Sequence, residues 1–253
     1  MRWIFAAVSL TLTAAFLSGP ALAGAWPMDP GQTQLIAKYE QSRAQTAFDD
    51  KGLEVAIAKQ SYQTLDIFVE HGWTKTLTIQ GDLRQILSQD NLGYAPNRTT
   101  ADLGLRWTPY KRGPWVISLY AGGAVLAAKD KAQLAMSDSR SANLEARALI
   151  GREIMVLHHR GFAELQVAQL SHNGHFNEER VETRFGLDVA KDWQVFAQTY
   201  AGTRTNQSRW SKAELSLVRK VGPIRLQAGW RQSVSGQSAA VESGPVLALW
   251  YRF

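Results

Sequence analysis

A serine and two histidines lie close together in the run SHNGH at 171–175. A histidine that takes the proton from a serine hydroxyl turns that oxygen into a nucleophile. Adjacent residues of an extended strand point to opposite faces, so Ser171 and His172 are poorly placed to bond to each other. His172, His175 and Glu178 are also of metal-binding types, but a His-x-x-His spacing in a loop is unspecific. The run therefore predicts a polar loop, with no catalytic residue, no metal site and no cofactor.

Residues of opposite charge lie two positions apart in several segments, for example Asp82 and Arg84. Period 2 puts both members of such a pair on one face of a strand. Because buried charges must pair or be hydrated, such faces indicate either an ionic network that fills a barrel or a hydrated pore. The residues predicted to line this interior are Asp66, Glu70, Asp82, Arg84, Asp102, Arg106, Glu145, Arg147, Glu182, Arg184, Glu214, Arg225 and Arg231. Acids dominate up to Glu182 and bases from Arg184 onward, which predicts one acidic and one basic wall.

The elements that would position these charges are segments of alternating polarity, each about ten residues long, as a tilted membrane strand requires. They are 33–43, 61–71, 74–87, 99–108, 115–126, 142–154, 161–171, 181–190, 193–203, 211–220, 223–233 and 244–253. Short connections alternate with longer polar ones (44–60, 88–98, 127–141, 172–180, 204–210 and 234–243), and both termini fall on the short side. We therefore predict an all-β fold, a single antiparallel transmembrane barrel of about twelve strands over residues 24–253.

Aromatic residues gather beside the short connections. Amphipathic rings prefer the boundary of a membrane, so such a group predicts one aromatic girdle. Its members are Trp73, Trp107, Trp115, Trp193, Tyr251 and Phe253. A second girdle toward the long loops would use Tyr39, Tyr62, Tyr200, Trp210 and Trp230, although Tyr62, Tyr200 and Trp210 share the parity of the inward residues.

The amino terminus has the order of a secretory signal peptide: a basic residue, an apolar run from Ile4 to Leu17, and the small-residue ending Ala21-Leu22-Ala23. We expect residues 1–23 to be removed by a cut after Ala23. The net charge of +6 is dispersed and no nucleic-acid-binding motif is present, so nucleic acid is not an expected partner.

The final strand, 244–253, ends in an aromatic residue and resembles the closing strand of Gram-negative outer-membrane β-barrels. Residues 68–79 resemble the strand-turn-strand phrase of porin- and transporter-like barrels, and residues 24–27 (GAWP) resemble the start of uncharacterised proteobacterial exported barrels. The resemblance implies the bacterial outer membrane as location. It also implies outer-membrane lipid, lipopolysaccharide and the barrel-assembly machinery as partners. Outer-membrane lipid hydrolases carry a signature that resembles H-x-S-N, whereas this chain has S-H-N.

These observations together predict a narrow passive channel for small polar or charged solutes, and not an enzyme. Two alternatives remain. A non-conducting structural or surface-interaction barrel is favoured if bulky inward residues block the bore, and a lipid-modifying hydrolase is favoured if a Ser, a His and a third polar group converge at the outer rim.

Deleting Phe253 should lower insertion into the outer membrane while synthesis continues, because this residue resembles the assembly signal of the closing strand. Quantitative blotting of outer-membrane and soluble fractions measures the effect. Normal insertion of the truncated chain would contradict the role given to the last residue.

Overall fold

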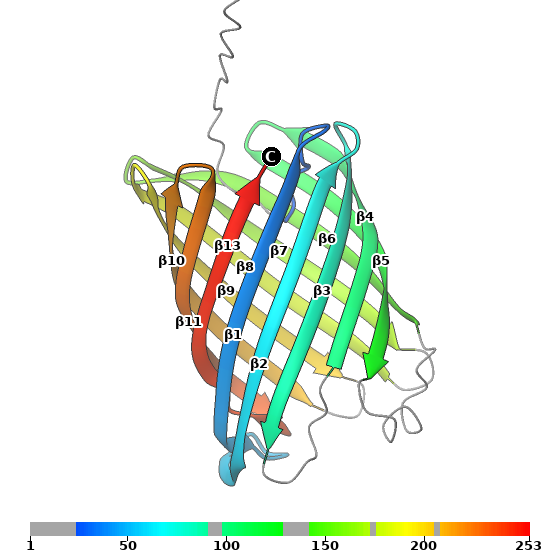
Figure 1. Cartoon of the computed structure of the whole chain (residues 1–253), viewed down its shortest axis with the longest axis vertical. Helices are drawn as coiled ribbons and strands as arrows, with labels where there is room; N and C mark the ends of the chain where they lie inside the picture. Colours follow the sequence, from blue (N-terminus) through cyan, green and yellow to red (C-terminus); the bar gives the residue numbers. More distant parts are fainter. Residues whose placement is uncertain (1–23, 91–97, 129–141, 173–175, 205–207) are drawn as a thin grey trace, which may run out of the picture.

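The computed structural model describes residues 24–90, 98–128, 142–172, 176–204 and 208–253. These residues form one antiparallel sheet of twelve long strands and the two-residue β12 (Figure 1). The strands are β1 (Thr33–Phe48), β2 (Glu54–Gly72), β3 (Leu77–Asp90), β4 (Arg98–Arg112), β5 (Trp115–Ala128), β6 (Ala142–Val156), β7 (His159–His172), β8 (Phe176–Ala190), β9 (Trp193–Arg204), β10 (Arg209–Val221), β11 (Ile224–Gln237), β12 (Ala239–Ala240) and β13 (Ser243–Arg252). The described part of the chain contains no helix long and apolar enough to cross a membrane.

The sheet closes on itself through β1, which pairs with β2 on one side and with β13 on the other. The β1–β13 register places Leu35 opposite Tyr251, and the Thr33 and Phe253 backbones exchange two hydrogen bonds of 2.7 and 2.9 Å. Closure leaves no unpaired edge along the wall, which a bilayer requires because lipid offers backbone groups no hydrogen bonds. The predicted single antiparallel barrel is therefore confirmed.

Each predicted segment overlaps one long strand, and the clearest difference lies at 44–60. We expected a long loop there, but β1 runs to Phe48 and β2 begins at Glu54. The turn is compact because the Asp49 carboxylate accepts hydrogen bonds from the backbone N–H groups of Lys51 and Leu53, both at 2.8 Å. A side chain that bonds to the backbone just ahead of it replaces ladder bonds and holds the chain reversal. This hairpin extends the wall beyond its neighbours at the long-loop end.

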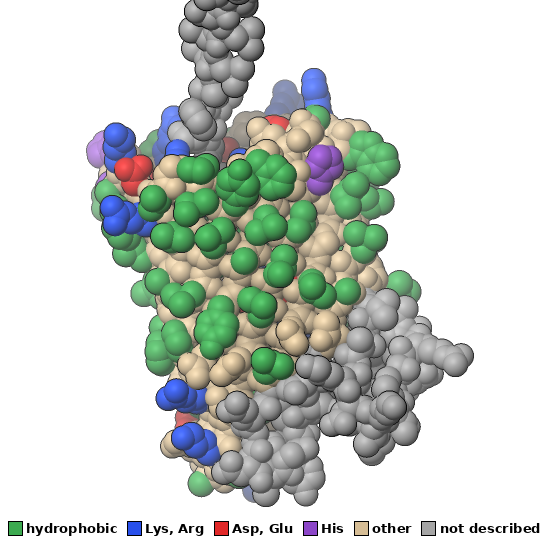
Figure 2. Space-filling model, viewed as in Figure 1, with side chains coloured by type: hydrophobic (Ala, Val, Ile, Leu, Met, Phe, Trp, Pro, Cys, Tyr) green, Lys and Arg blue, Asp and Glu red, His purple; other side chains and the backbone are tan. Residues whose placement is uncertain are grey.

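The outer surface of the wall is apolar. Leu103, Leu144, Leu215 and Leu247 are each more than half exposed. Figure 2 shows hydrophobic side chains covering the wall, with Lys and Arg gathered toward its two ends. An apolar band between charged rims is the surface that contacts lipid in a membrane barrel.

The predicted girdle residues all lie on this outer surface, at the end of the barrel that carries the short turns. Trp73, Trp107, Trp115, Trp193, Tyr251 and Phe253 are all exposed. Arg152 lies over the Trp115 ring at 4.8 Å and Arg219 over the Trp193 ring at 5.1 Å, as expected where amphipathic side chains meet headgroups. The second girdle is wrong for Tyr62, Tyr200 and Trp210, which point into the lumen, while Tyr39 and Trp230 are exposed outside.

The residues before the first strand belong to the interior. Residues 24–28, which we call the plug segment, lie inside the barrel, where Ala25, Trp26 and Met28 are 0, 5 and 3% exposed. The sequence interpretation treated 24–253 as one barrel and did not separate this segment from the wall. The signal peptide expected at 1–23 lies outside the described residues.

A charge on the outer wall should be far more costly than one inside. Leu65→Arg faces lipid and should lower the free energy of unfolding by about 2–4 kcal/mol if the residue lies near the bilayer midplane. Its neighbour Thr64 lines the lumen, so Thr64→Arg is the matched control with a smaller loss. Denaturant titration in lipid vesicles measures both, and equal losses would contradict the assignment of faces.

Candidate functional site

A cavity of about 830 Å³ occupies the long-loop half of the lumen. Its lining includes residues from every long strand, because inward and outward side chains alternate along each of them. Ser42, Tyr62, Arg204 and Trp210 line the part of the cavity near the long loops. Phe162 and Trp250 line the part near the short turns. The volume falls within the usual range of ligand sites.

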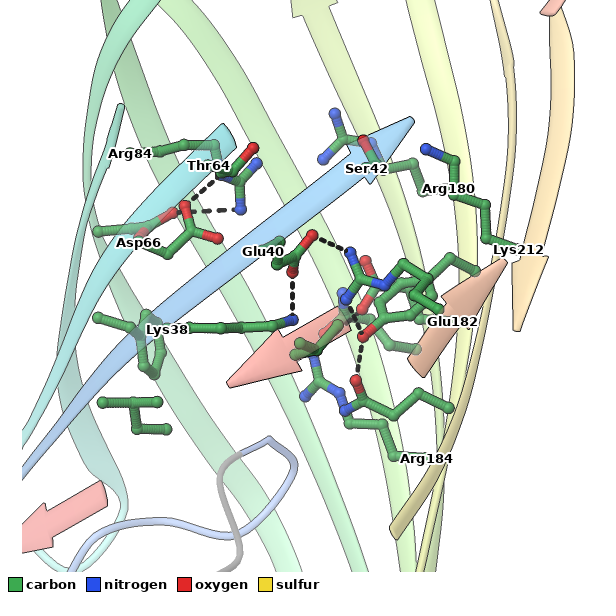
Figure 3. A pocket seen from close by; sticks show the side chains of 18 of the residues that line it. Lys38, Glu40, Ser42, Thr64, Asp66, Arg84, Arg180, Glu182, Arg184 and Lys212 are labelled. Atoms are coloured by element: carbon green, nitrogen blue, oxygen red, sulfur yellow. Dashed lines mark hydrogen bonds and ion pairs between the residues drawn. The ribbon is translucent and has the colours of Figure 1, made fainter. Parts of the chain in front are cut away.

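Ion pairs line the wall formed by the early strands. The Arg84 Nε lies 2.6 Å from Asp66 Oδ1 across the β2–β3 ladder, and Figure 3 shows these two side chains together in the cavity. Arg147 Nη2 lies 2.7 Å from Glu145 Oε2, two positions away on β6. Tyr120 lies beside this second pair, with its ring 4.3 Å from the Arg147 guanidinium carbon. Charges two residues apart on one strand, or opposite each other on neighbouring strands, therefore neutralise each other locally.

A second ionic group joins β1, β10 and β11 around Arg231. Its Nη1 lies 2.6 Å from Glu40 Oε2 and its Nη2 lies 2.6 Å from Glu214 Oε2. The Arg231 Nη2 also donates to the Tyr200 hydroxyl at 2.9 Å. Lys38 completes the group, with its Nζ 2.6 Å from Glu40 Oε1, as Figure 3 shows. Each member has two or more partners, so this group rigidifies one side of the lumen.

The two walls of the cavity differ in sign. The lining residues on β2 to β6 include more acids than bases: Asp66, Glu70, Asp82, Asp102 and Glu145 against Arg84 and Arg147. The rest of the lining includes more bases than acids: Lys38, Arg180, Arg184, Arg204, Lys212 and Arg231 against Glu40, Glu178, Glu182 and Glu242. A lumen whose two walls carry opposite net charge orients dipolar and zwitterionic solutes.

Aromatic side chains form the floor of the cavity. Phe162, Phe196 and Trp250 project inward from β7, β9 and β13, and Trp26 of the plug segment packs beneath them. Trp26 meets Phe162 edge-on at 5.7 Å between ring centroids, and Phe196 meets Trp250 edge-on at 6.0 Å. Val116, Ser118 and Val218 are at most 2% exposed in the same layer. Water does not reach these side chains, so the short-turn half of the lumen is packed and the cavity ends there.

Arg106 holds the plug segment in place. This β4 side chain is fully buried and its Nη1 lies 2.5 Å from Oε1 of Glu70, which is also fully buried. The same guanidinium donates to the backbone carbonyls of Gly24 and Trp26. The Ala25 N–H donates to Glu164 at 2.6 Å, and the Met28 N–H donates to the Thr78 hydroxyl at 3.1 Å.

Two further features show that the wall is shaped to receive this segment. The Ser118 hydroxyl donates to the Ala25 carbonyl, so three consecutive residues of the plug segment have a backbone carbonyl bonded to the wall. A Cβ added to Gly151 would lie 2.6 Å from the Trp26 indole, so only glycine leaves room for that ring. The plug segment is therefore an integral part of the interior.

Most of the predicted interior residues line the cavity: Asp66, Glu70, Asp82, Arg84, Asp102, Glu145, Arg147, Glu182, Arg184 and Arg231. Three do not. Arg106 is buried against the plug segment, Glu214 is buried beneath Lys38 and Arg231, and Arg225 lies at the short-turn end of β11, opposite Trp250 in the ladder.

The sequence interpretation also missed residues that belong to the lumen. The sequence predicts a loop at 172–180, but β8 begins at Phe176, and Glu178 and Arg180 line the cavity. The run Glu178, Arg180, Glu182 and Arg184 keeps strict period 2, which was the available signal for a longer strand. The plug segment carried no periodic signal at all.

The SHNGH run is only partly described. Ser171 is exposed near the end of β7, whereas the His172 side chain and residues 173–175 lie outside the described part. Among the described residues, no group of three or more His, Asp or Glu side chains is arranged to hold a metal ion.

Comparison with known proteins places this fold. No protein-family model matches the chain, and no curated protein matches it in sequence. Solved structures do match. The outer membrane channel COG4313 from Pseudomonas putida F1 superposes with a TM-score of 0.66 at 9% identity, over 90% of this chain and 98% of that one. The fold is that of the outer-membrane β-barrels.

Two further outer-membrane barrels are less similar. The NanC porin matches with a TM-score of 0.54 at 7% identity, over 86% of this chain and 98% of that one. LpxR from Salmonella typhimurium matches with a TM-score of 0.53 at 8% identity, over 87% and 99%. The predicted resemblance to Gram-negative outer-membrane barrels is confirmed at the level of the fold.

Arg106 should be the most costly lumenal arginine to remove. Arg106→Met leaves the Glu70 carboxylate buried without its cation, so we expect a loss of about 3–5 kcal/mol in the free energy of unfolding. Arg84→Met is the matched control, since that side chain is 42% exposed and a solvated pair contributes about 0–1 kcal/mol. Denaturant titration of the refolded variants compares them, and similar losses would contradict the central place given to Arg106.

Proposed function

We propose that this protein is a narrow passive channel of the outer membrane for small polar or charged solutes, closed at its short-turn end by the plug segment. The observation that carries the proposal is the charge-lined cavity of about 830 Å³ that ends on residues 24–28. In outer-membrane barrels the short turns face the periplasm. Solutes would therefore enter from the cell exterior and meet the closure before the periplasm.

The chemistry of the lining supports a hydrated route over a filled scaffold. Buried ion pairs add little to stability compared with apolar packing of the same volume. A barrel built only for rigidity has no need of so many charges around an empty volume, and its short-turn half shows that this chain can fill a lumen with apolar rings. Charges of both signs beside a cavity instead suit ions, zwitterions and other small polar solutes that exchange water for side-chain contacts.

The closure depends on a few named contacts. Among the described residues, one chain segment occupies the centre of the short-turn half, and it is held by hydrogen bonds to Arg106, Ser118, Thr78 and Glu164. The wall around it is a continuous ladder that would survive its displacement. A conducting state therefore requires movement of residues 24–28 and no change in the barrel.

Channels and porins of similar fold support the channel proposal in general terms. The Pseudomonas putida protein is an outer membrane channel. The KdgM porin, which matches with a TM-score of 0.53 at 8% identity over 87% of this chain and 99% of that one, is known in complex with oligogalacturonate. At such identities the likeness concerns the fold, so the choice of solute has to come from this chain's own lining.

Deleting residues 24–30 should raise the conductance of the purified protein in planar bilayers. The full-length protein should give rare or small steps, because its lumen is packed at the plug segment, and the deletion variant should give larger and longer ones. Trp26→Ala should have an intermediate effect. Trp73→Ala, which removes an exposed tryptophan from the outer girdle, is the matched control and should leave conductance unchanged.

Absence of conductance in both the full-length and the plug-deleted proteins, together with exclusion of small sugars from liposomes that contain them, would overturn the channel. The non-conducting structural barrel would then be the better description. Heat-modifiable migration in unboiled gels confirms beforehand that each variant has formed a barrel, since a closed ladder resists unfolding.

A further inference from the structure

The first described residue, Gly24, is buried in the lumen beside a carboxylate. The Glu164 side chain is 1% exposed, and its Oε2 accepts the Ala25 N–H at 2.6 Å. The Gly24 carbonyl accepts a hydrogen bond from Arg106. The peptide unit that follows the Gly24 Cα is therefore held between a buried carboxylate and a buried guanidinium.

Geometry brings the Gly24 nitrogen close to this carboxylate. A Cβ built on Gly24 would overlap both oxygens of Glu164, and the residue has φ of +132°. The nitrogen is two bonds away from that Cβ position and so lies within about 5 Å of the carboxylate. A larger residue here would push the Glu164 carboxylate away, so glycine permits the close approach of the two.

The carboxylates around Gly24 are short of cations. Glu164 has one guanidinium, that of Arg184 at 3.1 Å, and Arg184 is shared with Glu182, also at 3.1 Å. On the other side, Glu70 bonds to Arg106 through Oε1, while Glu70 Oε2 is buried with no hydrogen-bond partner among the described residues. An incompletely neutralised carboxylate inside a barrel is costly unless a further cation or donor reaches it.

We propose that Glu164 is the binding site for the α-ammonium group of Gly24, which exists only after the chain has been cut between Ala23 and Gly24. A signal peptidase would supply the cut by hydrolysis, in which one water molecule is consumed. The peptide bond breaks, a carboxylate is left on Ala23, and the amine left on Gly24 is mostly protonated at neutral pH. The ammonium group has three donors where the peptide had one, and it adds the missing positive charge beside Glu164.

This site couples maturation to closure of the lumen. The ammonium–carboxylate pair would fix the end of the plug segment, and Arg106 and Ser118 already hold its next carbonyls. Cleavage would therefore add a charged anchor at the end of a plug segment that the wall already holds through its backbone. The inference concerns the amine alone and holds whether or not the barrel conducts.

The first experiment uses the protein purified from outer membranes after expression with its leader. Intact-mass measurement and amino-terminal sequencing should give a chain that begins at Gly24. The folded protein is then treated with an acetylating N-hydroxysuccinimide ester at neutral pH, and the Gly24 peptide is followed by mass spectrometry. Its amine should react at least about tenfold more slowly than in the unfolded protein, because the reagent must wait for local opening.

Controls separate the proposed ion pair from general burial. Lys75, in the exposed turn between β2 and β3, is the internal reference and should react at similar rates in both states. Glu164→Gln keeps an acceptor for the Ala25 N–H but removes the charge, and it should speed acetylation of Gly24 in the folded protein. Glu178→Gln removes a lumenal carboxylate that pairs with Arg180 and Arg204 and not with Arg184, so it should leave that rate unchanged.

Three results would overturn the proposal: a mature chain that begins at another residue, a Gly24 amine that reacts as fast in the folded as in the unfolded protein, or equal effects of the two Glu→Gln substitutions. The first two need only the wild-type chain, so they decide the matter even if Glu164→Gln does not fold. None of them involves conductance, so failure here and failure of the channel are distinguishable.

Discussion

The hydrogen-bonded ladder between β1 and β13 is the constraint on which the rest of the molecule depends. Eight residue pairs from Gln34–Arg252 to Arg43–Ser243 join the first strand to the last. In lipid an open edge would leave its N–H and C=O groups without partners, so the sheet must close. Closure then divides every strand into a lipid face and a lumen face, and all later features of the molecule follow from what is placed on each.

The lumen face differs in chemistry between the two ends of the barrel. Toward the long loops it carries charges that pair across neighbouring strands and leave a cavity between them. Toward the short turns it carries aromatic rings and one fully buried ion pair, Arg106 with Glu70. The side chains of a twelve-stranded wall do not fill the centre of this half unaided, and the plug segment supplies the missing volume. Trp26 reaches Phe162, and the surrounding polar groups bond to its backbone.

This division of the lumen is the basis of the proposed channel. In that proposal the cavity lined by charges of both signs would admit polar solutes, and the packed layer at the short-turn end would stop them. The layer combines rings from the strands with the plug segment, which lies outside the ladder. The movement of residues 24–28 proposed for conduction would therefore leave every backbone bond of the wall in place.

Local patterns in the sequence determined the strand number, the antiparallel order, the inward and outward faces and the outer girdle at the short turns. The alternation of Leu226, Ala228 and Trp230 with Arg225, Gln227 and Arg231 is a signal of period 2, which differs from the 3.6-residue period of a helix. Closure needs only that each strand pairs with the next. The sequence also showed that Tyr62, Tyr200 and Trp210 fall at the alternate positions of their strands that point inward. Only the tertiary structure decided which charges meet, because partners such as Arg231 and Glu40 are 191 positions apart. It also decided that residues 24–28 fold back into the lumen, since a non-periodic segment of a few residues is placed by contacts with Arg106 and Glu164 on distant strands and by no local preference of its own.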